Sequence, residues 1–479
     1  MQKDLFAGYD QQHFYCELFG AGERQPAHTR KLVNRLAKMK GSTLRRRAKA
    51  IEAELYNLGI TFTVYSDRDS IDRILPFDVM PRVLSRKEWD HIEAGCIQRV
   101  TALNLFLHDI YNGQKILKDK ILPAELVLGN ANYRQEMVGF SPPGGTYVHI
   151  AGVDLVRNDE GGFCVLEDNA RTPSGVSYVV ENRHLMHRAF PDLMQGINLL
   201  PVDDYGPRLR HALNEVSGGR TRSSNIVLMS PGVFNSAYFE HVFLAREMGV
   251  PLVEGRDLTV EDDHVFMRTT GGLKKVDMIY RRIDDEFLDP ECFNSSSMLG
   301  VPGIMRAYLA GNVNIANAVG TGVADDKAVY AYLPEIVRYY LDQDPILDNV
   351  ETYSCWDPKM LEYTLANLDK LVVKPVGESG GYGVVVGPRA TKAELQTLKK
   401  QVQAKPKNFI SQPLIQLSVC PTLFDSGVEA RHVDLRPYIL TGKSSWVLPG
   451  GLTRVALTKG SFVVNSSQGG GTKDTWVIG

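Results

Sequence analysis

Apolar residues recur at every third or fourth position after Ser85 and predict a long amphipathic helix. Ser85 and Glu88 form a capping box at its start, and Pro76 and Pro81 interrupt whatever precedes it. We therefore expect residues 1–120 to be mainly helical and to contribute packing, not chemistry. The spacing puts these side chains on one helix face: Trp89, Ile92, Cys96, Val100, Leu103 and Leu107.

Between about 125 and 220 the pattern becomes strand-like. Residues 147–150 are rich in β-formers, and residues 153–156 alternate between apolar and polar. An Asn/Asp/Gly turn at 158–162 then leads into a second apolar run at 163–167. Two such runs around that turn predict a β-hairpin.

Residues 225 to about 315 have the pattern of an α/β unit. A buried strand at 225–229 is followed by a helical run at 236–248. Gly249 directly after this run is the type of residue that ends a helix. Short apolar runs at 252–253 and 278–280 supply further strands. This spacing predicts a small parallel sheet.

The segment from about 320 to the end is mixed and rich in glycine. We expect a helix near 325–342, which Pro334 should kink or shorten at its start. A strand at 371–374, a hairpin partner at 384–386, a helix near 391–402 and several late strands follow. Residues 466–471 have the most flexible composition, and no internal repeat is present.

Composition fits an ordinary soluble protein and excludes several classes. The chain has 479 residues, of which 43% are hydrophobic and 23% charged, with a net charge of −2. No basic field favours nucleic acid, and no stretch approaches the roughly 18 apolar residues of a membrane span. The six cysteines form no C-x-x-C pair, and the N-terminus lacks a signal segment. We expect a cytoplasmic protein without nucleic-acid or membrane partners.

The loop at 374–383 is a candidate phosphate site. It begins with Lys374 at a strand end and contains Gly377, Gly380, Gly381 and Gly383. Glycines let backbone amides approach an oxyanion, and the lysine adds charge. Its context fits neither a P-loop nor a Rossmann turn. A plain glycine-rich hairpin is the alternative.

Asp154, Glu167 and Asn169 are candidate metal ligands. Glu167 and Asn169 share one face because a strand has a period of two, and Asp154 lies on the partner strand. Two carboxylates and an amide oxygen suit Mg²⁺ carrying nucleotide phosphates. An acidic surface hairpin is the alternative.

Three weaker features lie near these motifs. Arg436 and Arg454 lie in late strands and can bind a phosphate or carboxylate, although each alone is more often a salt-bridge partner. The strand at 409–414 offers an apolar edge for an adenine ring, or is an ordinary core strand. Lys327 follows two aspartates at a helix start, which is usual for a surface charge.

Together these residues resemble the ATP-grasp superfamily. That superfamily runs from lysine, to lysine with glycine loop, to arginine strand, to Asp and Glu-x-Asn. Here the Asp and Glu-x-Asn set comes first, as a circular permutation produces. The order is similar to the permuted group that includes glutathionylspermidine synthase. Stretches 169–175, 280–285 and 466–471 also look like bacterial members of that group, and the resemblance spans about 75–479.

The resemblance implies an α/β (α+β) fold, a circularly permuted ATP-grasp with a small parallel-sheet pre-ATP-grasp unit and a helical N-terminal region. The segments would be a helical region (1–120), a permuted segment with the metal hairpin (121–220), the pre-ATP-grasp-like unit (221–320) and the lysine and glycine-loop segment (321–479). ATP and Mg²⁺ are the implied cofactors, with Asp154, Glu167 and Asn169 on the metal. The implied ATP-binding residues are Lys327, Lys374, Gly377, Ser379, Gly380, Gly381, Gly383, Ile410, Gln412 and Leu414.

Two departures from glutathionylspermidine synthases affect the expected chemistry. Those enzymes often carry a separate Cys/His amidase domain, and residues 1–75 are too short for one, so hydrolase activity is not expected. They also place an arginine two residues before the metal aspartate, where this sequence has Gly152. We expect Arg171 and Arg454 to replace that arginine, and Arg436, Arg454 and Arg171 to be the catalytic set.

The implied activity is that of a carboxylate–amine ligase that forms an amide through an acyl phosphate. Its partners would be a small-molecule or peptide acid and an amine, with a polyamine- or peptide-like product; the sequence does not indicate an oligomeric state. A nucleotide-binding scaffold without turnover is the alternative, against which the intact metal trio argues. A Rossmann dehydrogenase on 225–255 fails because G-x-G-x-x-G is missing there.

Overall fold

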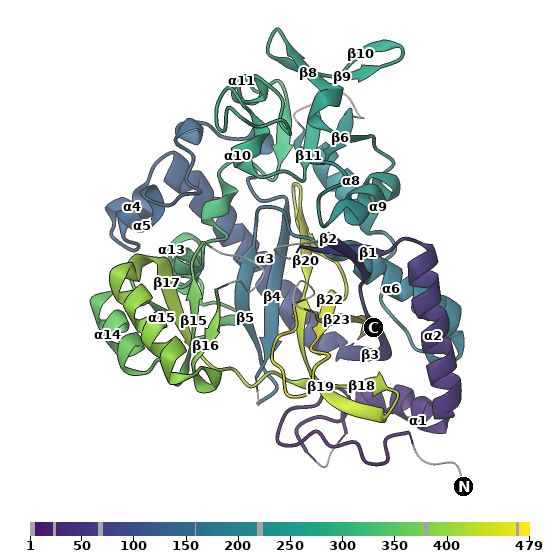
Figure 1. The fold of residues 1–479 in the computed structure, drawn as a ribbon. Coiled ribbons are helices and arrows are strands. Elements are labelled where there is room, and N and C mark those ends of the chain that lie inside the picture. The colour runs from purple at the N-terminus through teal and green to yellow at the C-terminus, as the bar shows by residue number, and fades with distance from the viewer. Residues whose placement is uncertain are drawn as a thin grey trace.

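A ten-stranded mixed sheet forms the centre of the chain, whose computed structural model describes residues 5–22, 25–65, 70–158, 160–217, 224–377, 383–465 and 469–479 (Figure 1). Its main order is β13-β5-β4-β19-β22-β23-β3. The strands on this path are β13 (Asp348–Asn349), β5 (Phe163–Asn169), β4 (Ile150–Arg157), β19 (Gly427–Arg436), β22 (Leu452–Val455), β23 (Gly471–Ile478) and β3 (Phe77–Ser85). The remaining three are β18 (Val419–Phe424), β20 (Tyr438–Thr441) and β21 (Ser445–Val447).

Helices cover both faces of this sheet. The period of two sends Val477 to one core with α3 (Arg86–Tyr111) and Trp476 to another with α2 (Gly41–Asn57) and α6 (Val176–Ala189). The capping box of Ser85 and Glu88 begins α3 as predicted. Ile150 lies on the α6 face, so Gly152 and Asp154 of the same strand face that side too.

The predicted α/β unit is confirmed and stands above the central sheet in Figure 1. Its four parallel strands have the order β12-β11-β6-β7, and Gly249 ends α9 with a φ of 63°. An antiparallel sheet of three strands lies beside it. The elements are β6 (Ile226–Met229), β7 (Leu252–Val253), β11 (Met278–Arg281), β12 (Asn314–Ala316), β8 (Leu258–Glu261), β9 (His264–Thr269), β10 (Gly272–Lys275), α8 (Tyr205–Val216), α9 (Tyr238–Met248), α10 (Asp285–Leu288) and α11 (Ile304–Leu309).

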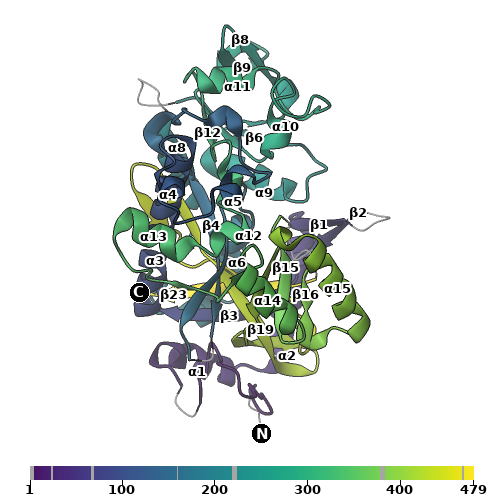
Figure 2. The ribbon, with the colours of Figure 1, turned by 90° about the vertical axis from the view of Figure 1, so that its left-hand side faces the viewer.

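A small antiparallel sheet carries the predicted lysine strand and its hairpin partner. Its order is β14-β17-β15-β16, with α14 and α15 packed beside it (Figure 2). Pro334 lies in the first turn of α13, so the expected helix divides into α12 and α13. The elements are β14 (Tyr353–Ser354), β15 (Leu371–Pro375), β16 (Val385–Val386), β17 (Phe409–Pro413), α12 (Lys327–Tyr330), α13 (Leu333–Leu341), α14 (Pro358–Ala366) and α15 (Lys392–Ala404).

The prediction that residues 1–120 are mainly helical overlooked three strands. β1 (Thr61–Tyr65) pairs with β2 (Ser70–Ile74), and β3 pairs in parallel with β23. Pro81 lies in β3 where the register with β23 shifts, a position that tolerates proline. The remaining short helices are α1 (Arg30–Lys38), α4 (Lys115–Lys118), α5 (Ala124–Leu128) and α7 (Pro191–Met194). The four-part division of the chain stays a proposal.

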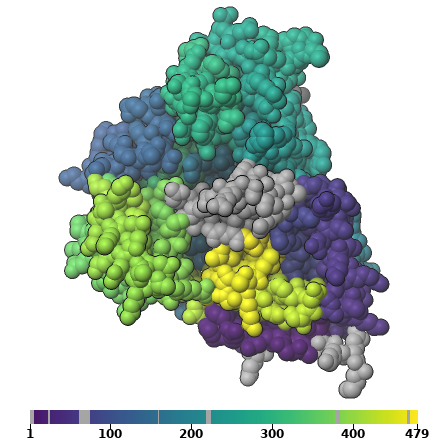
Figure 3. Space-filling model, viewed as in Figure 1, coloured from purple at the N-terminus to yellow at the C-terminus, as the bar shows by residue number. Residues whose placement is uncertain are grey.

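Figure 3 shows this face of the molecule in space-filling form, with the α/β unit above and the small antiparallel unit to one side. In the described ranges, no helix is both long and apolar enough to cross a lipid bilayer. Ser379, Gly380 and Gly381 of the predicted glycine loop, and residues 466–468, lie outside the described residues.

Candidate functional site

The hairpin of β4 and β5 brings the three predicted metal ligands together. Asp154 lies directly opposite Glu167, and Gly152 lies opposite Asn169. Opposed residues of an antiparallel pair project from the same face at close range. The amide nitrogen of Asn169 is 3.4 Å from Asp154 Oδ1. The predicted hairpin is therefore confirmed, and a bulge between Asp154 and Leu155 sets its register. Metal binding stays a prediction.

Two arginines from neighbouring strands occupy the carboxylate of Asp154. Arg436 of β19 donates from Nη2 to Oδ2 over 2.8 Å and from Nε to Oδ1. Arg454 of β22 donates to Oδ2 over 2.6 Å. Burial opposes ionisation of Asp154, yet the two guanidinium groups hold its pKa well below the usual range.

Arg454 is also bound to a second buried carboxylate. Its Nε donates to Asp434 Oδ1 over 2.9 Å. The Asp434 side chain is 1% exposed and that of Arg454 8%. Burial raises the pKa of Asp434 although Arg454 opposes the shift. Arg454 thus neutralises two buried carboxylates at once.

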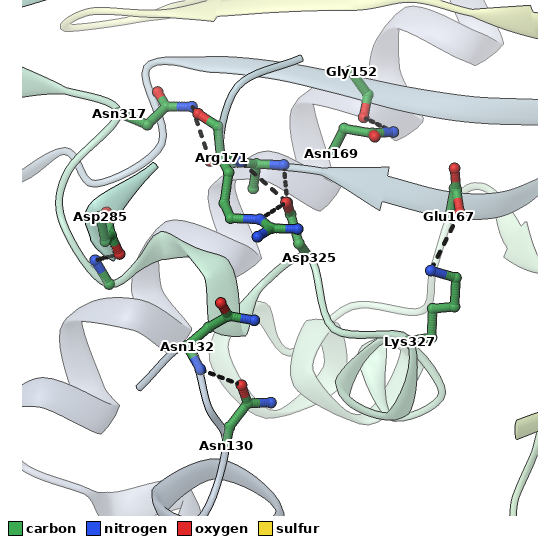
Figure 4. Close-up of polar contacts among 12 residues, drawn as sticks. Asn130, Asn132, Gly152, Glu167, Asn169, Arg171, Asp285, Asn317, Asp325 and Lys327 are labelled. Atoms are coloured by element: carbon green, nitrogen blue, oxygen red, sulfur yellow. Dashed lines mark hydrogen bonds and ion pairs between the residues drawn. The ribbon is translucent and has the colours of Figure 1, made fainter. Parts of the chain in front are cut away.

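Arg436 fills the space beside Gly152, where an arginine was expected from the resemblance. A Cβ on Gly152 would lie 3.2 Å from Arg436 Cδ. Arg171, one of the two predicted substitutes, turns instead to Asp325, and its Nε donates to Oδ2 over 2.6 Å (Figure 4). Arg436 therefore occupies the space beside Gly152, because β19 pairs with β4. The predicted replacement of the missing arginine by Arg171 and Arg454 stays a prediction.

Glu167 lies between cations at the edge of this network. Its carboxylate is 3.9 Å from Lys327 Nζ and 4.0 Å from Arg436 Nη2, and its side chain is 31% exposed (Figure 4). Burial and the charge of Asp154 raise the pKa of Glu167. Of the two hairpin carboxylates, Glu167 is the one accessible to a ligand.

The donor set fits a Mg²⁺ ion that nucleotide phosphates help to hold. Hard oxygen atoms of Glu167 and Asn169 face the same space, and Mg²⁺ commonly takes only one or two protein carboxylates. Asp154 fits less well, since both of its oxygens accept arginine hydrogen bonds. Within the described ranges no cluster of three or more His, Cys, Asp or Glu side chains could hold a metal.

A cavity of about 240 Å³, here called the nucleotide cavity, lies between the small antiparallel sheet and the hairpin. Lys374, Gln412 and Leu414 line one side, while Glu167 and Arg454 line the other. Lys327 of α12 also lines it, positioned by Asp326, which caps that helix. Its apolar wall suits an adenine ring: Val156, Leu166, Val372, Val386, Ile415, Leu417 and Phe462.

Three other predicted nucleotide residues do not line this cavity. Ile410 is 1% exposed and packs into the main core, so its nucleotide contact stays a prediction. Gly377 lines a separate cavity of about 440 Å³ on the far side of Pro375. Gly383 has a φ of +69°, and a Cβ there would lie 3.0 Å from Pro375. A glycine is therefore required where the loop returns.

The two predicted lysines form a positive wall in the nucleotide cavity. Burial lowers the pKa of Lys374 to about 8, and the nearby charge of Lys327 contributes, against the opposite effect of Glu167. Two cations held close together bind anions well, because a phosphate group relieves their mutual repulsion. We expect both lysines to contact ATP phosphates.

Replacing Lys374 is therefore expected to weaken ATP binding. Lys374→Ala removes a charge-assisted contact and should cost about 1.5–3 kcal/mol. Calorimetric titration with a non-hydrolysable ATP analogue measures this directly. If the affinity is unchanged in Lys374→Ala and also in Lys327→Ala, the phosphate assignment is wrong.

The same lysine predicts a pH dependence. Lys374 is protonated below its pKa of about 8 and loses its charge above it, so analogue affinity should fall as pH rises from about 7 to 9. Lys374→Arg stays charged over this range and should show a shallower fall. Equal slopes for the two proteins would contradict the assignment.

A second cavity of about 340 Å³, here called the substrate cavity, adjoins the first. Glu167, Arg454 and Asn465 line both cavities. Asn169, Arg171 and Arg436 line only the second cavity. Of the predicted metal and arginine residues, Glu167 and Arg454 therefore lie at the boundary. A molecule in the substrate cavity would face the nucleotide across Glu167 and Arg454.

The α/β unit holds the 170–175 loop that forms one wall of the substrate cavity. Asn317 donates to the carbonyl of Ala170 over 2.8 Å, and Arg282 to that of Pro173 over 2.7 Å. Glu240 accepts from the amide of Gly175 over 2.7 Å. Sequence reasoning missed Asn317 and Glu240, which stand in no recognisable motif. Arg282 belongs to the 280–285 stretch that had been noted.

Comparisons with known proteins agree on the family. A family model described as circularly permuted ATP-grasp type 2 matches residues 81–456. An uncharacterized protein of Synechocystis sp. is 49% identical over 471 residues, which cover 98% of each chain. An uncharacterized protein of Mycobacterium tuberculosis is 47% identical over a match that covers 99% of this chain and 86% of the length of that protein.

Two further matches provide different kinds of information, one a named relative and the other a solved structure. A Frankia alni protein named "Putative glutamate--cysteine ligase 2-3" is 42% identical over 98% of this chain, which spans only 54% of that protein. A solved structure, a glutathione synthetase-like effector of Globodera pallida in apo form, has a TM-score of 0.60 at 11% identity. The structural match covers 92% of this chain and 98% of the effector chain. At this sequence identity the likeness shows the fold alone.

Proposed function

Because the chain belongs to the circularly permuted ATP-grasp type 2 family, we propose that it is an ATP-dependent carboxylate–amine ligase that forms an amide through an acyl phosphate. The family and the fold support an ATP-dependent ligase, and the Frankia relative's name agrees with C–N bond formation. A glutathionylspermidine synthase-like acid and amine, and a cytoplasmic location, remain finer parts of this proposal.

One observation carries the proposal: the nucleotide and substrate cavities meet at Glu167 and Arg454. An acid in the substrate cavity would present its carboxylate to the phosphate end of a nucleotide lying along Lys374 and Lys327. Such positioning converts a bimolecular encounter into a reaction between neighbours. A ligase needs this junction, whereas a nucleotide-binding scaffold does not.

The roles of the residues follow from their places. Lys374 and Lys327 would bind the β- and γ-phosphates, and Arg454 and Arg436 would stabilise charge on the transferring phosphoryl group and the acceptor carboxylate. Mg²⁺ held by Glu167 and Asn169 would neutralise phosphate oxygens. The carboxylate attacks the γ-phosphorus and displaces ADP. An amine then attacks the acyl carbon and displaces phosphate, losing a proton as the amide forms.

Product analysis tests this mechanism. With ATP, Mg²⁺ and a library of acids, hydroxylamine can stand in for the amine because it traps acyl phosphates as hydroxamates. ADP and phosphate should form in a 1:1 ratio with the hydroxamate. Stoichiometric AMP and pyrophosphate would show attack at the α-phosphorus and would refute the acyl-phosphate route.

A non-catalytic nucleotide-binding scaffold is the second candidate. One observation favours it: both oxygens of Asp154 are held by arginines, which leaves the predicted metal trio incomplete. A scaffold would bind ATP in the same calorimetric titration but release no ADP with any acid and amine pair. Acid-dependent ADP release decides for the ligase.

A further inference from the structure

The substrate cavity extends away from the nucleotide along the end of β5. Glu167, Asn169 and Arg171 alternate along the chain, and all three line this cavity. Glu167 also lines the nucleotide cavity, whereas Arg171 does not. Four residues of extended chain span at most about 13 Å. Arg171 therefore marks the end of the cavity that lies away from the phosphate-transfer boundary.

Arg171 is held in place as a charged fork. Asp325 Oδ2 accepts from its Nε over 2.6 Å, while Asp325 Oδ1 accepts from the backbone amides of Ala170 and Arg171. Figure 4 shows this clamp, with Lys327 and Glu167 apart from it. Asp325 is thus committed to fixing the arginine, and its own side chain is 13% exposed.

The outer end of this guanidinium remains accessible. The Arg171 side chain is 31% exposed, and neither of its Nη atoms has a hydrogen-bond partner in the described ranges of the chain. Two parallel N–H groups at that end match a carboxylate bidentately. The buried Arg183, which pairs with Asp474, differs in that both of its Nη atoms donate to backbone carbonyls.

The rest of the lining indicates the kind of molecule between the two ends. Thr172, Ser174 and Ser236 bring hydroxyl groups that can bond to amides, and Pro173 and Leu452 add apolar surface. The carbonyls of Pro173 and Ser174 are already bonded to Arg282 and Tyr438, so this wall is fixed. A short peptide-like chain suits such a mixture.

We propose that Arg171 binds a second carboxylate of the acid substrate, remote from the one that reacts, so that the acid is a dicarboxylic, peptide-like molecule. This inference rests on the proposed function, because the nucleotide boundary decides which carboxylate reacts. In this proposal Arg171 sets specificity, in place of the catalytic role that the resemblance implied.

The test compares diacids with their monoamides. Glutarate, adipate and N-acetylglutamylalanine are each paired with the monoamide that keeps a single carboxylate, and hydroxylamine traps the acyl phosphate. Wild-type protein should prefer at least one diacid over its monoamide by about 10- to 100-fold in kcat/KM. Arg171→Gln should reduce that preference to about 3-fold or less, because KM rises for the diacid and much less for the monoamide.

Arg338→Gln is the matched control. Arg338 forms an equivalent arginine–aspartate pair with Asp344 on the surface, over 2.9 Å from Nε, and lines neither cavity. It should keep the wild-type preference. The inference is overturned if Arg171→Gln lowers kcat/KM by the same factor on a diacid and on its monoamide. It is also overturned if the wild-type protein prefers none of the diacids over its monoamide. In either case the ligase function stands.

A binding measurement separates this inference from the proposed function. Thermal shifts with the same acids, in the presence of a non-hydrolysable ATP analogue, require no turnover. If no acid supports ADP formation, the ligase proposal fails. The inference then survives only where a diacid stabilises wild type and Arg338→Gln but not Arg171→Gln; stabilisation that persists in Arg171→Gln, or is absent in wild type, overturns it.

Discussion

Glu167→Gln is expected to reduce acid-dependent ADP formation by about 10²- to 10³-fold, the usual cost of removing one charged group aimed at a transition state. Glu167 lines both cavities and has Lys327 at 3.9 Å. The glutamine keeps the shape of the side chain and removes its charge. Metal ligation and the balance of charge around the γ-phosphate should both fail, and the hydroxylamine assay measures the loss.

The expected pattern for Glu167→Gln separates chemistry from folding. Unfolding temperature and analogue affinity without Mg²⁺ should stay near wild type, since the ion pairs of this carboxylate with described residues are long, at 3.9 and 4.0 Å. Glu291→Gln removes an exposed carboxylate paired with Arg306, and it should leave the rate unchanged. A Glu167→Gln protein with wild-type turnover would remove Glu167 from the mechanism.

Arg454→Ala is expected to destabilise the folded chain by about 3–5 kcal/mol as well as to inactivate it. The change leaves Asp434, whose side chain is 1% exposed, without the cation that it pairs with. Asp154 keeps Arg436 and is less affected. Thermal and urea unfolding should both report the loss.

A double variant and pH identify the cause of that loss. Arg454→Ala combined with Asp434→Ala removes the buried charge together with its partner and should recover most of the stability. Burial already raises the pKa of Asp434 in the native state. Without Arg454 the pKa of Asp434 should rise further. The loss of unfolding free energy in Arg454→Ala should therefore become smaller as pH falls from about 7 to 5, because the Asp434 carboxyl takes up a proton. If the double variant is no more stable than Arg454→Ala, the charge explanation is wrong.

Local pattern was sufficient wherever one element or one turn decides the structure. The capping box at Ser85, the glycine that ends α9 and Pro334 at the start of α13 all follow from backbone chemistry within a few residues. The existence of the hairpin of β4 and β5 also follows from alternation and a turn, whereas its register does not. A bulge between Asp154 and Leu155 shifts the pairing by one residue and so places Asp154 opposite Glu167.

Local patterns did not predict pairing between strands that lie far apart in the sequence. β3 joins the sheet through β23, and the two strands come from opposite ends of the chain. Two prolines near β3 suggested an interruption, and only the register shift opposite Lys473 and Thr475 shows how the strand accommodates Pro81. The sequence therefore predicted helices where strands also occur, since no local signal records a distant partner.

The sequence by itself determined the chemical inventory: two lysines, a glycine loop, a Glu-x-Asn hairpin and late arginines in a permuted order. The tertiary structure decided how these are used. Arg436 and Arg454 converge on Asp154 because β19 pairs with β4 and β22 pairs with β19, and Arg171 turns away because Asp325 fixes it. The directions of these arginine side chains depend on which strands lie side by side and on ion pairs between residues distant in the sequence. Spacing along the chain does not predict either.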